Sequence, residues 1–158
     1  MSFRLPIKAR AFFKLIMGFH DSSATRFLMF DAYYAGLMIG LDARKLGNEV
    51  EVESDIFLGE YPDAYASQSD IIAGLLIDAE LERKAIDLTD RESIEDEVIK
   101  LLDPASATRL SNEGNRLLDL YAAYGMQQII DKMVQPPTVE DFLVGYRTFW
   151  GEVQAATE

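Results

Sequence analysis

The chain has no cysteine and only one histidine, His20, among its 158 residues. The absence of cysteine excludes disulfides, thiolate nucleophiles and cysteine-ligated zinc or iron–sulfur centres, and it is typical of a reducing compartment such as the cytoplasm. A single histidine is too few for the paired histidines of His-Glu-x-x-His zinc sites or ferritin-like di-iron sites. We therefore interpret His20 as a residue at the end of a helix.

Walker-type and dinucleotide-binding glycine patterns are also absent, and no apolar run is long enough to cross a bilayer. Basic residues are scarce: the chain has 15 of them against 27 acidic residues, a net charge of −12. Such an acidic surface repels phosphate backbones, which argues against nucleic acid as a partner. The length and a hydrophobic content of 49% instead predict one folded domain over residues 1–158.

The charge is unevenly distributed along the chain. Residues 1–20 hold four basic and no acidic residues, whereas the other 138 residues carry a net charge of −16. One interpretation is a first helix, Pro6–Gly18, that docks on the domain while its basic face meets acidic residues. The alternatives are an organellar presequence and a helix that binds a membrane surface through residues 1–20.

The segment from Ser22 to Gly47 predicts a helix buried at the centre of the fold. Its middle, from Phe27 to Leu41, is apolar except for Asp31, so it has no polar face to turn to solvent. Ser22 or Ser23 can cap its start, and Gly47 can end it in a left-handed conformation.

Small residues recur at every fourth position of this segment, at Ala32, Gly36 and Gly40. Such a row lies along one strip of a helix and lets a second helix approach closely. Each glycine costs helix stability, about 1 kcal/mol relative to alanine. We therefore expect a tight crossing with another helix to compensate for that cost.

Four further helices are predicted after Gly47. Glu49–Glu53 alternates acidic residues with valine, and we interpret it as an extended linker because no partner strand is evident. A helix begins between Pro62 and Ser69 and runs to about Asp87, with Glu80 among the residues on its polar side. The remaining three helices start at a Thr89–Glu92 capping box, at Pro104 with Asp103 as its cap, and at Thr138. Pro136-Pro137 ends the helix that starts at Pro104. The fold class expected is an all-α bundle of five or six helices around residues 22–47.

Asp31 is the candidate binding residue for which the sequence makes the sharpest case. A carboxylate among apolar neighbours is partly buried, so it needs a hydrogen bond, an ion pair or a proton. Tyr121, Tyr124, Tyr146 or an arginine could supply the partner. One interpretation is that Asp31 only orients two helices. The other is a ligand pocket formed with tyrosines, with the members Asp31, Tyr33, Tyr34, Tyr121 and Tyr124.

The last predicted helix has a wide aromatic face that either covers the central helix or forms a subunit interface. The interface residues expected are Phe142, Tyr146, Phe149 and Trp150. With no catalytic constellation evident, the leading hypothesis is a non-enzymatic, cytoplasmic, helical interaction or assembly module. It would form a homo-oligomer or bind a protein partner, and it would need no cofactor.

Carboxylates leave one enzymatic alternative open. Magnesium prefers oxygen ligands from a few acids together with substrate phosphates. A magnesium-dependent nucleotide or pyrophosphate hydrolase would therefore place acids on two facing helices, and Glu82 and Glu95 are the candidates. The competing interpretation is a solvated acidic surface, as is usual for acids on amphipathic helices.

Overall fold

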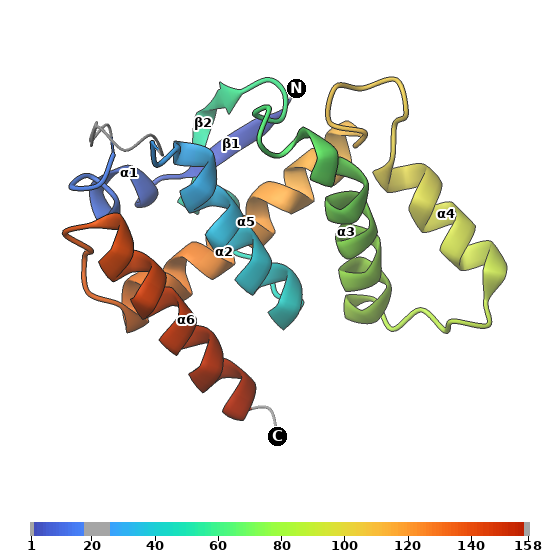
Figure 1. Cartoon of the computed structure of the whole chain (residues 1–158). Helices are drawn as coiled ribbons and strands as arrows, with labels where there is room; N and C mark the ends of the chain where they lie inside the picture. Colours follow the sequence, from blue (N-terminus) through green and yellow to red (C-terminus); the bar gives the residue numbers. More distant parts are fainter. Residues whose placement is uncertain (1, 18–25, 157–158) are drawn as a thin grey trace.

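The fold is built on two helices, α2 (Met29–Ala43) and α5 (Asn112–Lys132), that cross at the centre of the molecule (Figure 1). The computed structural model describes residues 2–17 and 26–156. α2 buries apolar side chains on most of its circumference, among them Phe30, Leu37 and Leu41. The prediction of a mostly helical fold is confirmed.

Glycines permit the close crossing of α2 and α5. A Cβ atom on Gly40 would lie 2.0 Å from the carbonyl oxygen of Tyr121, and one on Gly36 would lie 2.8 Å from that of Ala122. The approach is reciprocal, because a Cβ atom on Gly125 of α5 would lie 1.7 Å from the Gly36 carbonyl oxygen. The tight crossing expected from the glycine row is therefore present, and α5 is the partner.

The bounds predicted for the central helix are too wide. Arg26–Leu28 is not helical, Leu28 is extended at ψ 152°, and the carboxylate of Asp31 accepts a hydrogen bond from the Leu28 N–H at 2.7 Å. Arg44, in the left-handed conformation at φ 53°, ends the helix before Gly47. The predicted caps Ser22 and Ser23, and also His20, lie outside the described residues.

A two-stranded antiparallel sheet contradicts the all-α prediction. β1 (Phe3–Pro6) pairs with β2 (Val52–Leu58), and both strands lie beside α5. The predicted helix Pro6–Gly18 is wrong, since only the short α1 (Ala9–Phe12) is helical in residues 2–17. Alternation explains the strand: Phe3 and Leu5 are buried and Arg4 between them is not.

The linker interpretation of Glu49–Glu53 is also wrong. A 3-10 turn, η1 (Glu49–Glu51), leads directly into β2. The basic residues at the start of the chain meet acids on this side: Arg10 binds Glu53 with N–O distances of 2.7 and 3.1 Å.

Helices α3 (Ser69–Arg83) and α4 (Arg91–Leu101) pack against each other at one end of the molecule, after a short 3-10 turn, η2 (Ala66–Gln68). The predicted capping box is displaced by one residue. Asp90 caps α4 by accepting from the Ser93 N–H, while the Thr89 hydroxyl donates to Asp87. A charged carboxylate is a strong hydrogen-bond acceptor, and Asp87 therefore holds the Thr89 hydroxyl.

No helix starts at Pro104, contrary to prediction. A bridge between Leu102 and Leu110 closes a loop, and Ser111 caps α5 by accepting from the Gly114 N–H at 3.0 Å. The prediction for the last helix, α6 (Val139–Ala155), is confirmed at its start, where Thr138 accepts from the Asp141 N–H at 3.1 Å.

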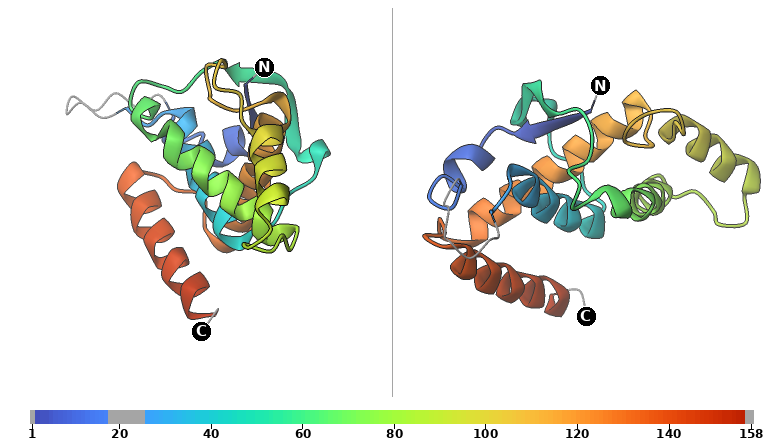
Figure 2. Two further views of the ribbon diagram at one scale, coloured as in Figure 1. Left: turned by 90° about the vertical axis from the view of Figure 1, so that its right-hand side faces the viewer. Right: turned by 45° about the horizontal axis from the view of Figure 1, so that its top comes forward.

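Helix α6 lies on the outside of the molecule, on the opposite side of α2 from α3 (Figures 1 and 2). Its first turns touch the core through Phe142, whose ring centroid is 5.0 Å from that of Phe13. Within the described residues, no helix combines the length and apolarity that crossing a bilayer requires.

Candidate functional site: a groove between α2, α3 and α6

A groove of about 970 Å³ runs over α2 between α6 and α3. In Figures 1 and 2, α2 lies between the other two helices, and the lining residues show that α2 forms the floor of the groove. Its volume is at the upper end of the range for small-molecule sites, about 300–1,000 Å³. Most of the groove surface is apolar.

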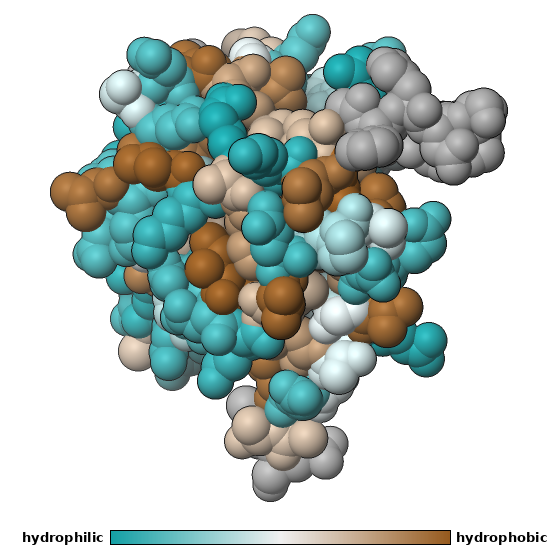
Figure 3. All heavy atoms as spheres, turned by 90° about the vertical axis from the view of Figure 1, so that its left-hand side faces the viewer, coloured by the Kyte–Doolittle hydropathy of each residue, from teal (hydrophilic) through white to brown (hydrophobic). Residues whose placement is uncertain are grey.

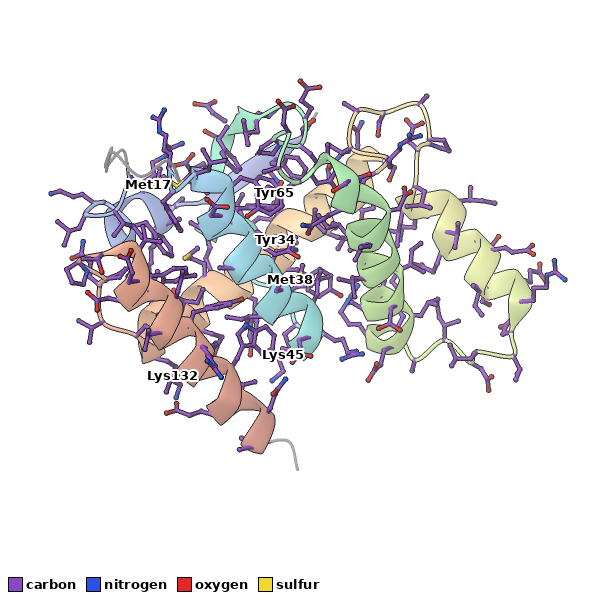
Figure 4. The ribbon with its side chains drawn as sticks, in the orientation of Figure 1. Met17, Tyr34, Met38, Lys45, Tyr65 and Lys132 are labelled. Carbon is purple, nitrogen blue, oxygen red and sulfur yellow. The ribbon has the colours of Figure 1, made fainter. Side chains whose placement is uncertain are left out.

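The floor of the groove is one stripe of α2. Tyr34, Met38 and Leu41 follow each other at four- and three-residue spacing, which places them on one face of the helix. Figure 4 shows Tyr34 and Met38 in succession along α2, with Tyr65 beside Tyr34; the centroids of the two tyrosine rings are 5.0 Å apart. Met38 is half-buried, and an unbranched thioether adapts readily to different ligand shapes.

The α6 wall is aromatic. Phe142, Tyr146 and Trp150 follow at four-residue spacing, with centroid distances of 5.6 and 6.1 Å between successive rings. The hydroxyl of Tyr146 donates to the Ala35 carbonyl at 2.8 Å, which ties α6 to α2. Burial raises the pKa of Tyr146 to about 12, so it remains a donor at neutral pH.

The structure divides the predicted interface residues. It brings Phe142, Tyr146 and Trp150 together on the groove. Phe149 is buried but does not line the groove. Val144 of α6 is exposed outside the groove, yet Figure 3 shows that apolar residues on the face carrying α1 and α6 alternate with polar ones. Most of the surface that lines the groove is apolar.

The structure also divides the predicted ligand pocket. Asp31 and Tyr34 both line the groove, whereas Tyr33, Tyr121 and Tyr124 do not. The hydroxyl of Tyr33 donates to Asp119 and that of Tyr121 to Glu80, in each case inside the core. The ring of Tyr124 lies 6.0 Å from the Lys45 ammonium.

Asp31 is half-buried at the start of α2, and its partner is a tyrosine outside the predicted set. Besides the Leu28 N–H, its carboxylate accepts the hydroxyl of Tyr65, from the turn before α3. Burial and the neighbouring carboxylate raise the pKa of Tyr65 well above its usual range. Asp31 thus joins α2 to the segment before α3 and also presents negative charge to the groove.

The groove carries four acids and two arginines, namely Asp31, Asp42, Asp78, Glu140, Arg26 and Arg44. Arg44 is engaged already, because it binds Asp78 at 3.2 Å and Glu82 at 2.5 Å. Among the described residues, Asp31, Asp42 and Glu140 have no cationic partner within ion-pair distance. The groove therefore combines apolar walls with an excess of negative charge.

The burial of Asp119 and Glu80, two acids outside the groove, was not predicted from the sequence. Asp119 is 1% exposed and accepts from the Arg4 backbone N–H at 3.1 Å and from the Tyr33 hydroxyl at 2.8 Å. Burial raises its pKa to about 7, although these donors and the charge of Arg4 oppose the rise. In the sequence, the position of Asp119 between Leu118 and Leu120 in an apolar stripe could have indicated this burial.

Glu80, placed on the polar side of its helix in the sequence, is completely buried. Arg83 binds it at 2.7 and 2.8 Å, and the Tyr121 hydroxyl donates to it at 2.7 Å. Burial acts to raise the pKa of Glu80, but the hydrogen bonds from Arg83 and Tyr121 outweigh it and lower the pKa. In the sequence, the three-residue spacing between Glu80 and Arg83 could have indicated this ion pair.

The candidate metal ligands have other partners. Glu82 binds Arg44 of α2, and Glu95 binds Arg91 of its own helix at 2.8 Å. In residues 2–17 and 26–156, no group of three or more His, Cys, Asp or Glu side chains is placed to hold a metal ion. Glu82 and Glu95 thus take part in separate ion pairs, and the magnesium-dependent hydrolase stays a prediction.

Comparisons with known proteins identify no relative: no protein-family model, curated protein sequence or solved structure matches this chain significantly.

Proposed function

We propose that this protein is a non-enzymatic interaction module that binds the apolar face of a partner helix in the groove between α2, α3 and α6. The observation that carries the proposal is the mostly apolar floor and wall formed by the α2 stripe and the α6 aromatics. An amphipathic helix in a groove is a recurring mode of recognition, in which anchors at i, i+3, i+4 and i+7 fill the groove.

The shape of the groove favours a helix over a compact ligand. Its floor extends from Asp31 to Asp42, which is about 16 Å of helix at 1.5 Å per residue. Leu75 on α3 and Leu143 on α6, at the two rims, are 38% and 57% exposed. A helix laid between them would cover both rims and complete a layer of three helices over α2.

The chemistry of the groove favours binding over catalysis. Its ionisable groups are carboxylates, arginines and tyrosine hydroxyls. Asp31 and Tyr65 bind each other, and Tyr146 is held by a backbone carbonyl. Aromatic residues and methionine, which dominate the floor and the α6 wall, are the types enriched at the centres of protein interfaces.

A built-in probe tests the proposal. Trp150 is the only tryptophan in the chain and lines the groove. The ligand is a designed 18-residue helix without tryptophan, with leucine at i, i+3, i+4 and i+7 and glutamine on its polar face. We expect a saturable blue shift of Trp150 emission as this uncharged peptide covers the indole.

Two matched variants locate the binding. Met38→Gln keeps the size of the side chain but makes the floor polar, and it should weaken binding about tenfold, equivalent to roughly 1.4 kcal/mol. Ile99→Gln on α4, where the side chain is 75% exposed, should leave binding unchanged. A peptide that produces no saturable response, or that binds both variants equally, would remove the proposal. Trp150 emission that depends on protein concentration alone would point to a second copy in the groove.

A further inference from the structure

We infer that the helix bound in this groove is basic, with Lys or Arg side chains flanking its apolar stripe; the inference rests on the proposed function. The observation is the placement of acids on all three groove elements: Asp31 and Asp42 on α2, Asp78 on α3 and Glu140 on α6. An approaching helix therefore meets negative charge from the floor and from both walls.

The two acids on the floor set a spacing for the ligand. Asp31 and Asp42 are eleven residues apart, which is close to three turns and about 16 Å along the same side of α2. Tyr34, Met38 and Leu41 fill the distance between them. A ligand helix aligned along α2 would match this pattern with an apolar stripe of two to three turns and a cation at each end.

The positive charges of the groove do not offset these acids. Arg44 is bound by Asp78 and Glu82, so its charge is neutralised locally. Arg26 is the only other cation among the described groove residues. Asp42 and Glu140 are exposed, without an ion-pair partner in the part of the chain that the structure describes. They are therefore free to meet a ligand cation.

The position of Asp42 is unfavourable for the helix alone. It lies in the last turn of α2, where the helix dipole disfavours negative charge by about 0.3–1 kcal/mol. Residues that are unfavourable where they stand, and that gain no structural contact in return, are often functional. A cation from a bound helix would relieve the conflict.

The charge of the whole chain disfavours other occupants. At −12, it repels a second copy of itself and an anionic lipid surface. The same charge accelerates association with a basic helix, and rim charges of this kind act chiefly on specificity and on the association rate. A salt-dependent preference for a basic helix is therefore expected.

Two charged versions of the designed peptide test the inference, one with lysine and one with glutamate on the polar face. Trp150 emission should report at least tenfold tighter binding of the lysine peptide at low ionic strength, and the difference should shrink as salt is added. If the uncharged peptide binds but the lysine peptide has no advantage over the glutamate peptide, the inference is wrong and the proposed function stands. Failure of all three peptides overturns the proposed function itself.

Charge-reversal variants separate a local effect from the net charge. Asp42→Lys and the milder Asp42→Asn should each reduce the preference for the lysine peptide, and circular dichroism checks that both variants fold. Asp96→Lys makes the same charge change at an exposed position on α4, outside the groove. If Asp96→Lys reduces the preference as much as Asp42→Lys does, net charge explains the preference and the inference fails.

Discussion

Replacing Asp119 with asparagine should make the protein less sensitive to pH. Burial raises the pKa of Asp119 from 3.8 to about 7 in the folded state. Because the folded state holds this proton more tightly than the unfolded state, the contribution of Asp119 to stability is complete below about pH 4 and is lost as the pH rises to 7. The loss is at most about 4 kcal/mol, from roughly 1.4 kcal/mol for each pKa unit.

Asparagine keeps an oxygen acceptor for the Tyr33 hydroxyl and the Arg4 N–H but cannot ionise. The measurement is urea unfolding of wild type and Asp119→Asn at several pH values, followed by circular dichroism. Taking the difference between the two proteins at each pH cancels other titrating groups, including Glu80, whose lowered pKa acts in the opposite direction. Relative to wild type, the variant should gain stability between pH 4 and 8. A difference that is constant with pH would show that the ion pair with Arg4 cancels the effect of burial, and one that moves against the variant would show that the ion pair outweighs it.

Two further predictions concern the crossing and the assembly. Gly40→Ala should destabilise the fold by about 2–3 kcal/mol, because its Cβ would meet the backbone of Tyr121. Gly74→Ala, with open space around it, should stabilise the fold by up to about 1 kcal/mol; equal melting temperatures for the two variants would refute the crossing argument. Self-association, which the net charge of −12 disfavours at the groove, also stays a prediction; static light scattering tests it, and a strict monomer at micromolar concentration would refute it.

Local signals in the sequence predicted two features of the helices. The glycine row of α2 indicated a tight crossing, and Thr138 marked the start of α6, because both signals act within a few residues. The strands could not be predicted in the same way. Phe3–Pro6 is only four residues long and pairs with a segment some fifty residues away, so its stability depends on a partner that no local pattern reveals.

The candidate site was only partly predictable, for a related reason. Asp31 was recognisable because it interrupts an apolar run, but Tyr65 joins it through the placement of α3 against α2. The burial of Asp119 and Glu80 likewise depends on tertiary packing. The groove itself exists because α6 and α3 lie on opposite sides of α2, which the spacing of residues within any one helix does not determine.

Methyl NMR of the methionines tests the central claim most directly. The chain has six methionines; Met38 lines the groove, and Met126 is buried in the core away from it. With methyl-labelled protein, the uncharged peptide should shift the Met38 resonance in a saturable way and leave that of Met126 in place. Saturable binding with an unmoved Met38 methyl would show that the peptide docks elsewhere and would contradict the account.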